Sequence, residues 1–192
     1  MVSYNQRFPR PLIVVFAGPN DSGKSTATAF LPPNGTYVNA DDLQREHSLT
    51  GLEAAQKSEA IRNALVERKA DFTFETVLST ERNLLLLRKA RERGYEIQCV
   101  YVLTCNADIN VARVRGRVRE GGHDVPEDKI RSRYRKALEL LPQLIDACDR
   151  ILVYDNSIVP ILIFKKDAAG TEYYPTEIWP PEKLKKLLKK PD

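Results

Sequence analysis

Short apolar runs bounded by turn residues alternate along this chain with longer amphipathic stretches. Runs of this length that are rich in Val, Ile and Phe are typical of buried strands. They cover residues 12–18, 36–40, 71–77, 97–103 and 150–155. Because strands and helices alternate, the pattern predicts an α/β fold in which helices cover both faces of a mainly parallel sheet of five to six strands.

The amphipathic stretches predict helices wherever apolar residues recur at helical spacing. These helices are expected at residues 24–30, 52–69, 81–93, 109–120 and 126–148. After Ser157, two short apolar runs joined by a turn containing Gly170 predict a hairpin at one edge of the sheet. The tail at 180–192 predicts a short basic helix, which we interpret as a solvated cap of the domain without a function of its own.

The composition limits the classes of protein to which this chain can belong. The chain has 192 residues, enough for one buried core, and its net charge of +4 suits an anionic ligand without requiring nucleic acid. Three cysteines without a CxxC pair indicate neither a disulfide framework nor a zinc site. The N-terminus lacks the apolar core of a secretory signal, and no apolar run reaches the roughly 18 residues of a membrane span. We therefore expect a cytoplasmic protein that does not insert into membranes.

The first apolar run leads directly into the sequence Gly-Pro-Asn-Asp-Ser-Gly-Lys-Ser, which matches the phosphate-binding motif G-x-x-x-x-G-K-[ST] in full. Backbone N–H groups of such a loop point at phosphate oxygens, and the helix that follows adds positive potential. Lys24 is expected to reach the β- and γ-phosphates of ATP, and the Ser25 hydroxyl to bind Mg²⁺. The predicted nucleotide-binding residues here are Gly18, Pro19, Asn20, Asp21, Ser22, Gly23, Lys24, Ser25 and Thr26.

The loop identifies a nucleotide site but leaves the reaction open. The chain has no Asn-Lys-x-Asp motif for guanine, no LSGGQ motif of transporter ATPases, and no apolar strand that ends in the Asp-Glu pair of hydrolytic ATPases. These features favour an ATP-dependent kinase that acts on a small molecule. A hydrolytic ATPase and a nucleotide-binding interaction module are the alternatives.

Acidic residues follow the second and third predicted strands, at the sheet edge where α/β proteins bind ligands. Asp41 is the predicted catalytic base for an acceptor hydroxyl, with Asp42 in reserve. Asp42 is expected to cap a helix that starts at Leu43. Glu75 and Thr76 are predicted to contact the acceptor, and Glu75 could also reach Mg²⁺ through water. A purely structural Glu75 is the alternative.

The most basic segment predicts a helical, arginine-rich lid at about residues 107–136. Three of its arginines, Arg113, Arg117 and Arg133, are expected to stabilise charge on the transferred phosphate. Gly121 and Gly122 form a candidate hinge. The run lacks interleaved aromatic residues apart from Tyr134, which argues against nucleic acid as the partner.

Several motifs together resemble the zeta-toxin-like P-loop kinases over about residues 12–157. They are Gly-Pro-Asn-x-x-Gly-Lys-Ser-Thr, Val-Asn-Ala-Asp-Asp, Phe-Glu-Thr-x-Leu-Ser, Arg-Val-x-x-Arg-Val, Gly-Gly-His-Asp-Val-Pro and Tyr-Asp-Asn-Ser. The resemblance implies a P-loop NTPase fold, ATP with Mg²⁺, and transfer of phosphate to a UDP-amino sugar, with an antitoxin protein as partner. This chain is much shorter than the founding toxins, so the identity of the acceptor is left open.

The resemblance also implies roles for individual residues. Asp41 matches the catalytic base, Lys24 the phosphate-binding lysine, and Glu75 with Thr76 the end of the acceptor-side strand. Arg113, Arg117 and Arg133 match the lid arginines, and Asn156 is a candidate contact of the base or ribose. We expect a kinase domain over residues 1–165 and an appendage of hairpin and helix over 166–192.

Overall fold

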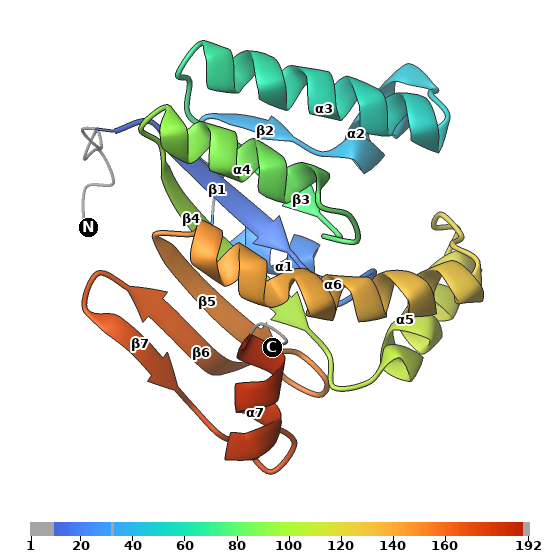
Figure 1. Cartoon of the computed structure of the whole chain (residues 1–192). Coiled ribbons are helices and arrows are strands. Elements are labelled where there is room, and N and C mark those ends of the chain that lie inside the picture. Colours follow the sequence, from blue (N-terminus) through green and yellow to red (C-terminus); the bar gives the residue numbers. More distant parts are fainter. Residues whose placement is uncertain (1–9, 32, 190–192) are drawn as a thin grey trace.

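The computed structural model describes residues 10–31 and 33–189. The N-terminal segment, predicted to lack an export signal, and the last residues of the basic tail lie outside this part of the chain. The described residues form one seven-stranded sheet in the order β2-β3-β1-β4-β5-β6-β7, flanked by helices (Figure 1). The strands are β1 (Leu12–Ala17), β2 (Thr36–Val38), β3 (Phe72–Thr76), β4 (Glu96–Leu103), β5 (Arg150–Asp155), β6 (Ile161–Asp167) and β7 (Gly170–Tyr173).

Strands β1 to β5 pair in parallel, whereas β6 and β7 pair antiparallel. The predicted α/β fold with a mainly parallel sheet is therefore confirmed. The sheet has more strands than the five to six expected, because the β6–β7 hairpin continues it beyond β5. Ile163 and Phe164 of β6 are buried in the main core, which fixes the hairpin to the rest of the domain.

The helices predicted at residues 24–30, 52–69, 81–93, 109–120 and 126–148 all form, with ends that agree to within about two residues. The helices are α1 (Lys24–Phe30), α2 (Ala40–His47), α3 (Gly51–Glu67), α4 (Arg82–Glu92), α5 (Ala107–Arg119), α6 (Glu127–Ala147) and α7 (Pro181–Leu188). At α7, Leu184 and Leu188 are buried in the main core, so this short basic helix packs against the domain. Division of the chain at residue 165 into a domain and an appendage stays a prediction.

The expected cap of α2 was wrong. Asn39, rather than Asp42, is the N-cap, and its Oδ1 accepts a hydrogen bond from the Asp41 N–H at 2.9 Å. The helix therefore starts earlier than Leu43, and both aspartates lie in its first turn, where negative charge is favourable. This placement puts Asp41 at the sheet edge and leaves its carboxylate uninvolved in capping.

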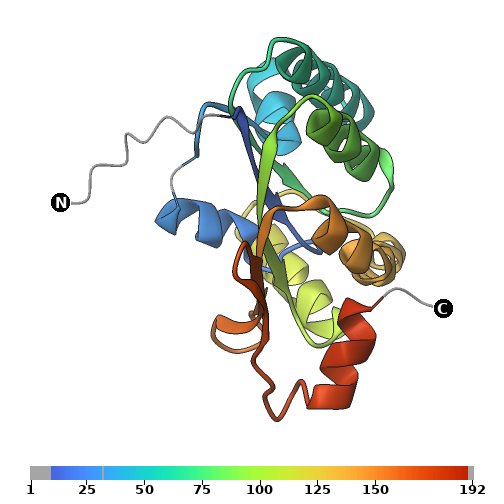
Figure 2. The ribbon, with the colours of Figure 1, turned by 60° about the vertical axis from the view of Figure 1, so that its left-hand side comes forward.

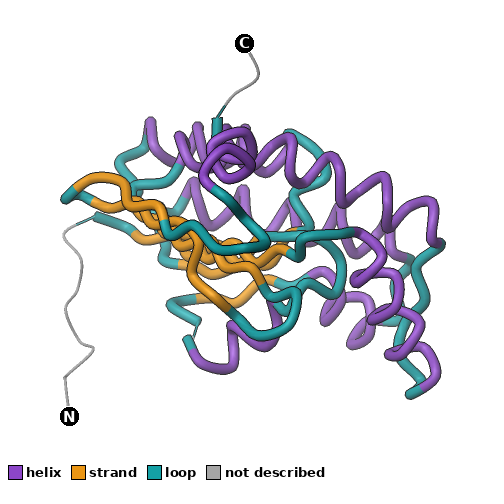
Figure 3. Tube along the Cα trace, turned by 90° about the horizontal axis from the view of Figure 1, so that it is seen from below, coloured by secondary structure: helices purple, strands orange, loops and turns teal. Residues whose placement is uncertain are grey.

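Helices cover both faces of the sheet, and the two faces bury clusters of different size. Alternate residues of β1 point to opposite sides, so Ile13 and Val15 join the main core while Phe16 packs towards α1 with Val100 and Val102 of β4. Figure 2 shows α1 on one side of the sheet and α3, α4, α6 and α7 on the other, and Figure 3 shows the strands as one layer between helices. In the described part of the chain, no helix has the length and apolar character needed to cross a membrane.

The order of the strands brings the predicted site residues to one edge. Strand β1 lies between β3 and β4, so the loop at its carboxyl end is central. The carboxyl ends of β2, β3 and β5 meet at the same edge, because all these strands are parallel. Tyr134 of α6 donates a hydrogen bond to the Thr104 carbonyl at 2.6 Å, which ties the second lid helix to the end of β4.

Candidate active site

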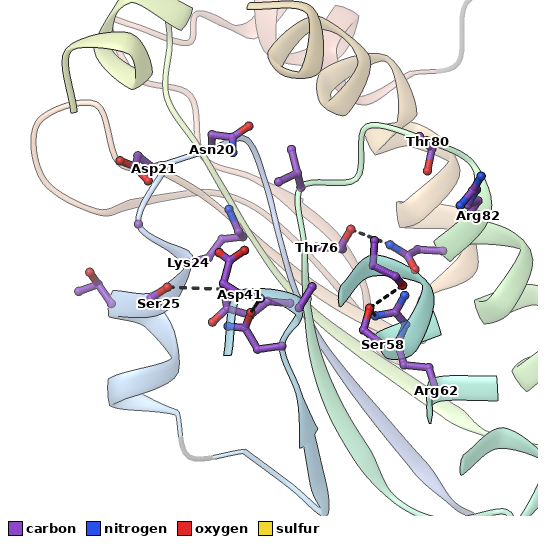
Figure 4. Close-up of a pocket in the computed structure, with 18 of the residues that line it drawn as sticks. Asn20, Asp21, Lys24, Ser25, Asp41, Ser58, Arg62, Thr76, Thr80 and Arg82 are labelled. Atoms are coloured by element: carbon purple, nitrogen blue, oxygen red, sulfur yellow. Dashed lines mark hydrogen bonds between the residues drawn. The ribbon is translucent and has the colours of Figure 1, made fainter. Parts of the chain in front are cut away.

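A cavity of about 740 Å³ opens at the carboxyl ends of the strands (Figure 4). One wall is the phosphate-binding loop with the start of α1. The opposite wall is α3 together with the loop between β3 and α4, and Asp41 of α2 also lines the cavity. A site with two walls can hold a phosphate donor and a second molecule at once.

The phosphate-binding loop needs glycine at both ends of its motif. Gly18 has a φ of 141°, and a Cβ atom there would lie 1.9 Å from the Val102 carbonyl oxygen. Gly23 has a φ of 107°, and its Cβ atom would lie 2.3 Å from Asn156 Nδ2. Positive φ and close approach both exclude larger residues, so these glycines fix the path of the loop.

Lys24 folds back onto its own loop. Its Nζ donates hydrogen bonds to the Gly18 carbonyl at 2.9 Å and to the Pro19 carbonyl at 2.7 Å. Burial lowers the pKa of the Lys24 ammonium, while the nearby carboxylates of Glu75, Asp21 and Asp41 oppose that shift. Lys24 and Asp41 therefore act on each other electrostatically across the cavity.

Ser25, the predicted Mg²⁺ ligand, lies beside the end of β3. Its hydroxyl is 3.5 Å from Glu75 Oε2, and Glu75 Oε1 accepts a hydrogen bond from the Tyr37 hydroxyl at 2.5 Å. Burial and this bond to Glu75 raise the pKa of Tyr37 well above its usual range. Among the residues that the structure describes, His, Cys, Asp and Glu form no cluster of three or more that could hold a metal. Mg²⁺ usually keeps several waters and is held by only one or two protein groups together with substrate phosphates, so Ser25 with Glu75 beside it fits such a site.

Asp41 and Asp42 differ in their surroundings. Asp41 is exposed to the cavity, and its carboxylate accepts no hydrogen bond from any residue of the described ranges. Asp42 is paired with Arg45 at 2.6 Å and does not line the cavity. Of the two, only Asp41 has a free carboxylate that faces a bound molecule.

Two of the three predicted lid arginines line the cavity. Arg113 donates to the Asn156 carbonyl at 2.7 Å, and Arg117 donates to Asp21 Oδ1 at 2.6 Å and to the His123 carbonyl at 2.8 Å. Both therefore connect α5 to the segments around the phosphate loop. Arg133 on α6 is not among the cavity-lining residues, so the structure does not bring it together with the other two.

Asn156 and Thr76 line the cavity, but their side chains already make hydrogen bonds within the protein. Asn156 Nδ2 donates to the Ser22 carbonyl of the phosphate loop at 2.8 Å. The Thr76 hydroxyl accepts hydrogen bonds from Asn83 Nδ2 at 2.7 Å and from the Leu78 N–H at 2.9 Å. Their predicted contacts with nucleotide and acceptor stay predictions.

Comparison with known proteins agrees with the motifs. The model of the Zeta toxin family matches residues 2–168 of this chain. The chain belongs to the Zeta toxin family. The predicted family resemblance is thereby confirmed.

Individual relatives of this Zeta toxin family member are distant in sequence. An uncharacterized protein of Haemophilus influenzae is 25% identical over 127 residues, which is 63% of this chain and 91% of that protein. A crystal structure of AvrRxo1-ORF1 and AvrRxo1-ORF2 with ATP matches with a TM-score of 0.72 at 14% identity, covering 93% of this chain and 64% of that one. A chain of the PezAT toxin–antitoxin system of Streptococcus pneumoniae matches with a TM-score of 0.58 at 16% identity, covering 80% of this chain and 71% of that one. These likenesses show a shared fold.

Sequence reasoning missed the far wall of the site in this Zeta toxin family chain. The residues concerned share one cavity surface and come from α3 and the β3–α4 segment: Ala55, Ser58, Glu59, Arg62, Thr80, Arg82 and Asn83. On α3 they recur three or four positions apart, which places them on one face. A polar stripe of this kind usually faces solvent, so only the packing of α3 over β3 reveals that it lines a cavity.

Proposed function

We propose that this chain is an ATP-dependent phosphotransferase that transfers the γ-phosphate of ATP to a hydroxyl of a small acceptor. One observation carries the proposal: Asp41, with a free carboxylate, and Lys24 of the phosphate loop line the same two-walled cavity. Membership of the Zeta toxin family and a fold shared with an ATP-bound structure support it.

Donor binding follows from the loop. Backbone N–H groups and the start of α1 would hold the phosphates of ATP, and Lys24 would exchange the Gly18 and Pro19 carbonyls for phosphate oxygens. Ser25 would hold Mg²⁺, and Glu75 would reach it through water. Mg²⁺ bound there would neutralise charge on the β- and γ-phosphates. We also propose that Asn156 lies beside the base or ribose, next to the loop that it holds.

Acceptor activation follows from Asp41. Its carboxylate would take the proton of the acceptor hydroxyl while that oxygen forms a bond to the γ-phosphorus and the bond to the β-phosphate oxygen breaks, which releases ADP. Arg113 and Arg117 would stabilise charge on the phosphate during its transfer, and Arg133 would join them on lid closure. Glu75 and Thr76 would hold the acceptor at the end of β3.

A UDP-amino sugar is one acceptor that the family resemblance offers, and the reaction would take place in the cytoplasm. An antitoxin is a proposed partner, because one structural neighbour comes from a toxin–antitoxin system.

The test measures ADP release from ATP with Mg²⁺, in the presence and absence of the small-molecule fraction of a bacterial lysate. A kinase releases ADP faster when that fraction is present, and Asp41→Asn abolishes the increase while the affinity for the non-hydrolysable analogue AMP-PNP is kept. Equal rates under both conditions would identify water as the acceptor. Binding of AMP-PNP without any ADP release would indicate an interaction module.

A further inference from the structure

Tyr37 is not among the residues that line the cavity, yet its hydroxyl reaches a carboxylate that does. Tyr37 lies in β2 opposite Thr73 of β3, and Glu75 follows two residues later, on the same face of the sheet. The Tyr37 hydroxyl donates to Glu75 Oε1 at 2.5 Å, and Glu75 lines the cavity. Any influence of this hydroxyl on a bound molecule therefore passes through a neighbouring side chain.

The hydrogen bond decides which oxygen of Glu75 faces Ser25. An ionised carboxylate can only accept, so the phenol is the donor, and a bond to a charged acceptor is stronger than one between neutral groups. With Oε1 held by Tyr37, Oε2 is the oxygen beside the Ser25 hydroxyl, at 3.5 Å, and the dashed line from Ser25 in Figure 4 marks this contact. That distance is longer than a strong O–H···O bond, so Oε2 can still accept another group.

Tyr37 is itself held by Asn39. Asn39 Nδ2 donates to the Tyr37 hydroxyl oxygen at 3.2 Å, and Asn39 Oδ1 accepts from the Asp41 N–H at 2.9 Å. Because a backbone N–H can only donate, it determines which end of the Asn39 amide faces Tyr37. Asn39 is the N-cap of α2, so the chain of hydrogen bonds that starts at Glu75 ends on the backbone of the helix that carries Asp41. The phenol thus has a fixed donor on one side and a fixed acceptor on the other.

We propose that Tyr37 is a positioning residue of the metal site, which holds Glu75 with one carboxylate oxygen directed towards the Mg²⁺ that Ser25 would bind. This inference rests on the proposed function and deepens it, because it assigns a role to a side chain outside the cavity. A glutamate that is already ordered loses less conformational entropy when the metal binds. Hydrogen-bond partners that orient metal-binding groups in this way commonly contribute to the affinity for the metal.

A purely structural role makes a different prediction. Strand β2 has only three residues and lies at the edge of the sheet, so the bond from Tyr37 to Glu75 also ties β2 to β3. If the bond served only this purpose, its loss would lower Tm and leave the effect of the metal unchanged. A positioning residue changes the effect of the metal, whatever happens to Tm.

The test measures the affinity of the full-length protein for AMP-PNP by calorimetry, once with Mg²⁺ and once with EDTA. The ratio of the two affinities reports how much the metal contributes to binding on the protein. We expect Mg²⁺ to raise the affinity of the wild type, and Tyr37→Phe, which removes only the hydroxyl, to reduce this rise by about threefold to tenfold. The affinity in EDTA should be unchanged, because Tyr37 does not line the cavity.

Two further variants show whether the effect belongs to this hydroxyl and acts through Glu75. Tyr174→Phe is the matched control, since Tyr174 is exposed, donates to Glu172 Oε2 at 2.6 Å and does not line the cavity. It should behave like the wild type. Glu75→Ala should reduce the effect of Mg²⁺, and addition of Tyr37→Phe to Glu75→Ala should cause no further loss.

The outcomes separate this proposal from the function on which it rests. An equal effect of Mg²⁺ in the wild type and Tyr37→Phe would show a structural tyrosine and overturn the proposal, and so would the absence of any effect of Mg²⁺ in the wild type. Losses that add up in the double variant would mean that Tyr37 acts independently of Glu75, which overturns it as well. Failure of AMP-PNP to bind to the wild type under either condition would instead refute the proposed function.

Discussion

The two walls of the cavity are built differently. On the donor wall, each cationic side chain already has protein partners: Lys24 binds two carbonyls of its loop, Arg117 binds Asp21, and Arg113 binds the Asn156 carbonyl. On the acceptor wall, formed by α3 and the β3–α4 loop, Arg62 donates only one hydrogen bond. Asp41 of α2, which lines the cavity beside these walls, accepts no hydrogen bond within the described ranges. The cations of the donor wall are thus held by contacts with the loop and its neighbours, although Arg117 Nε has no partner among the described residues. On the acceptor wall Arg82 pairs with Glu59, whereas Arg62 has no ion pair among the described residues.

This difference indicates which wall of the cavity selects the molecule that binds. A preassembled loop recognises phosphates through the backbone and serves any nucleotide of the right shape. Unsatisfied groups on the other wall discriminate, because a molecule that fails to pair them loses binding energy. The lid belongs to the donor wall through Arg113 and Arg117, yet α5 and α6 bury a small hydrophobic cluster of their own around Val114 and Ile130.

The largest loss of turnover is expected on replacement of Asp41. Replacement of Asp41 by Asn should lower the rate of product formation by up to roughly 10⁴-fold, because the base is lost, while affinity for AMP-PNP stays within about twofold. The measurement pairs steady-state turnover with a binding titration. Asp42→Asn is the control, since Asp42 faces Arg45 outside the cavity. Equal losses in the two variants would remove Asp41 from its role.

A somewhat smaller loss of rate is expected for Lys24→Met. Loss of the ammonium removes one group that stabilises charge on the γ-phosphate, so turnover should fall by roughly 10²- to 10³-fold. Affinity for AMP-PNP should also fall, which distinguishes this donor-wall variant from Asp41→Asn. Lys136→Met, at an exposed position of α6, serves as the control in both assays. Turnover close to that of the wild type in Lys24→Met would contradict the placement of the γ-phosphate.

Asn156→Ala tests whether contacts within the protein hold the phosphate-binding loop in shape. The substitution deletes the amide that donates to the Ser22 carbonyl, so the loop loses a support and the carbonyl loses its partner. We expect affinity for AMP-PNP to fall by about tenfold, with thermal stability little changed. Calorimetry on the purified variant measures the first effect, and Asn63→Ala on α3 provides the control. If nucleotide affinity is unchanged, the loop does not depend on Asn156 for its shape.

The smallest expected effect is a gain, rather than a loss, of affinity for the nucleotide. Asp21 places a carboxylate inside an anion-binding loop, where it pairs with Arg117 at 2.6 Å. Asp21→Asn should raise affinity for AMP-PNP by about fivefold at low salt, since one unfavourable charge pair at close range is worth about 1 kcal/mol in water. The gain should shrink in high salt. Asp124→Asn, which changes an exposed carboxylate after α5, should show no gain. A loss of affinity in Asp21→Asn would mean that the ion pair is needed to shape the loop.

Periodic features were predictable from the sequence, and contacts between distant segments were not. Buried strands and the loop from Gly18 to Ser25 can be recognised from short stretches of sequence. The parallel sheet and the nucleotide site could therefore be predicted. The cap of α2 failed because Asn39, Asp41 and Asp42 all suit a helix start, and only backbone geometry selects Asn39. Arg133 looked equivalent to Arg113 and Arg117, but the turn between α5 and α6 places it away from the cavity.

Arg62 lay beyond sequence reasoning for a similar reason. In the sequence it is one more charged residue on an amphipathic helix, a pattern typical of solvated faces. Its burial arises because α3 packs over β3 and brings Phe74 under the guanidinium. The acceptor wall therefore depends on tertiary packing, whereas the donor wall is encoded in one contiguous motif.

The most direct test of a phosphotransferase is to identify its product. Wild type, Lys24→Met and Asp41→Asn are each incubated with ATP, Mg²⁺ and a pool of bacterial metabolites that includes UDP-N-acetylglucosamine, and mass spectrometry searches for molecules that gain one phosphate. We predict a product that forms only with the wild type. ATP binding without any such product across the pool would contradict the account.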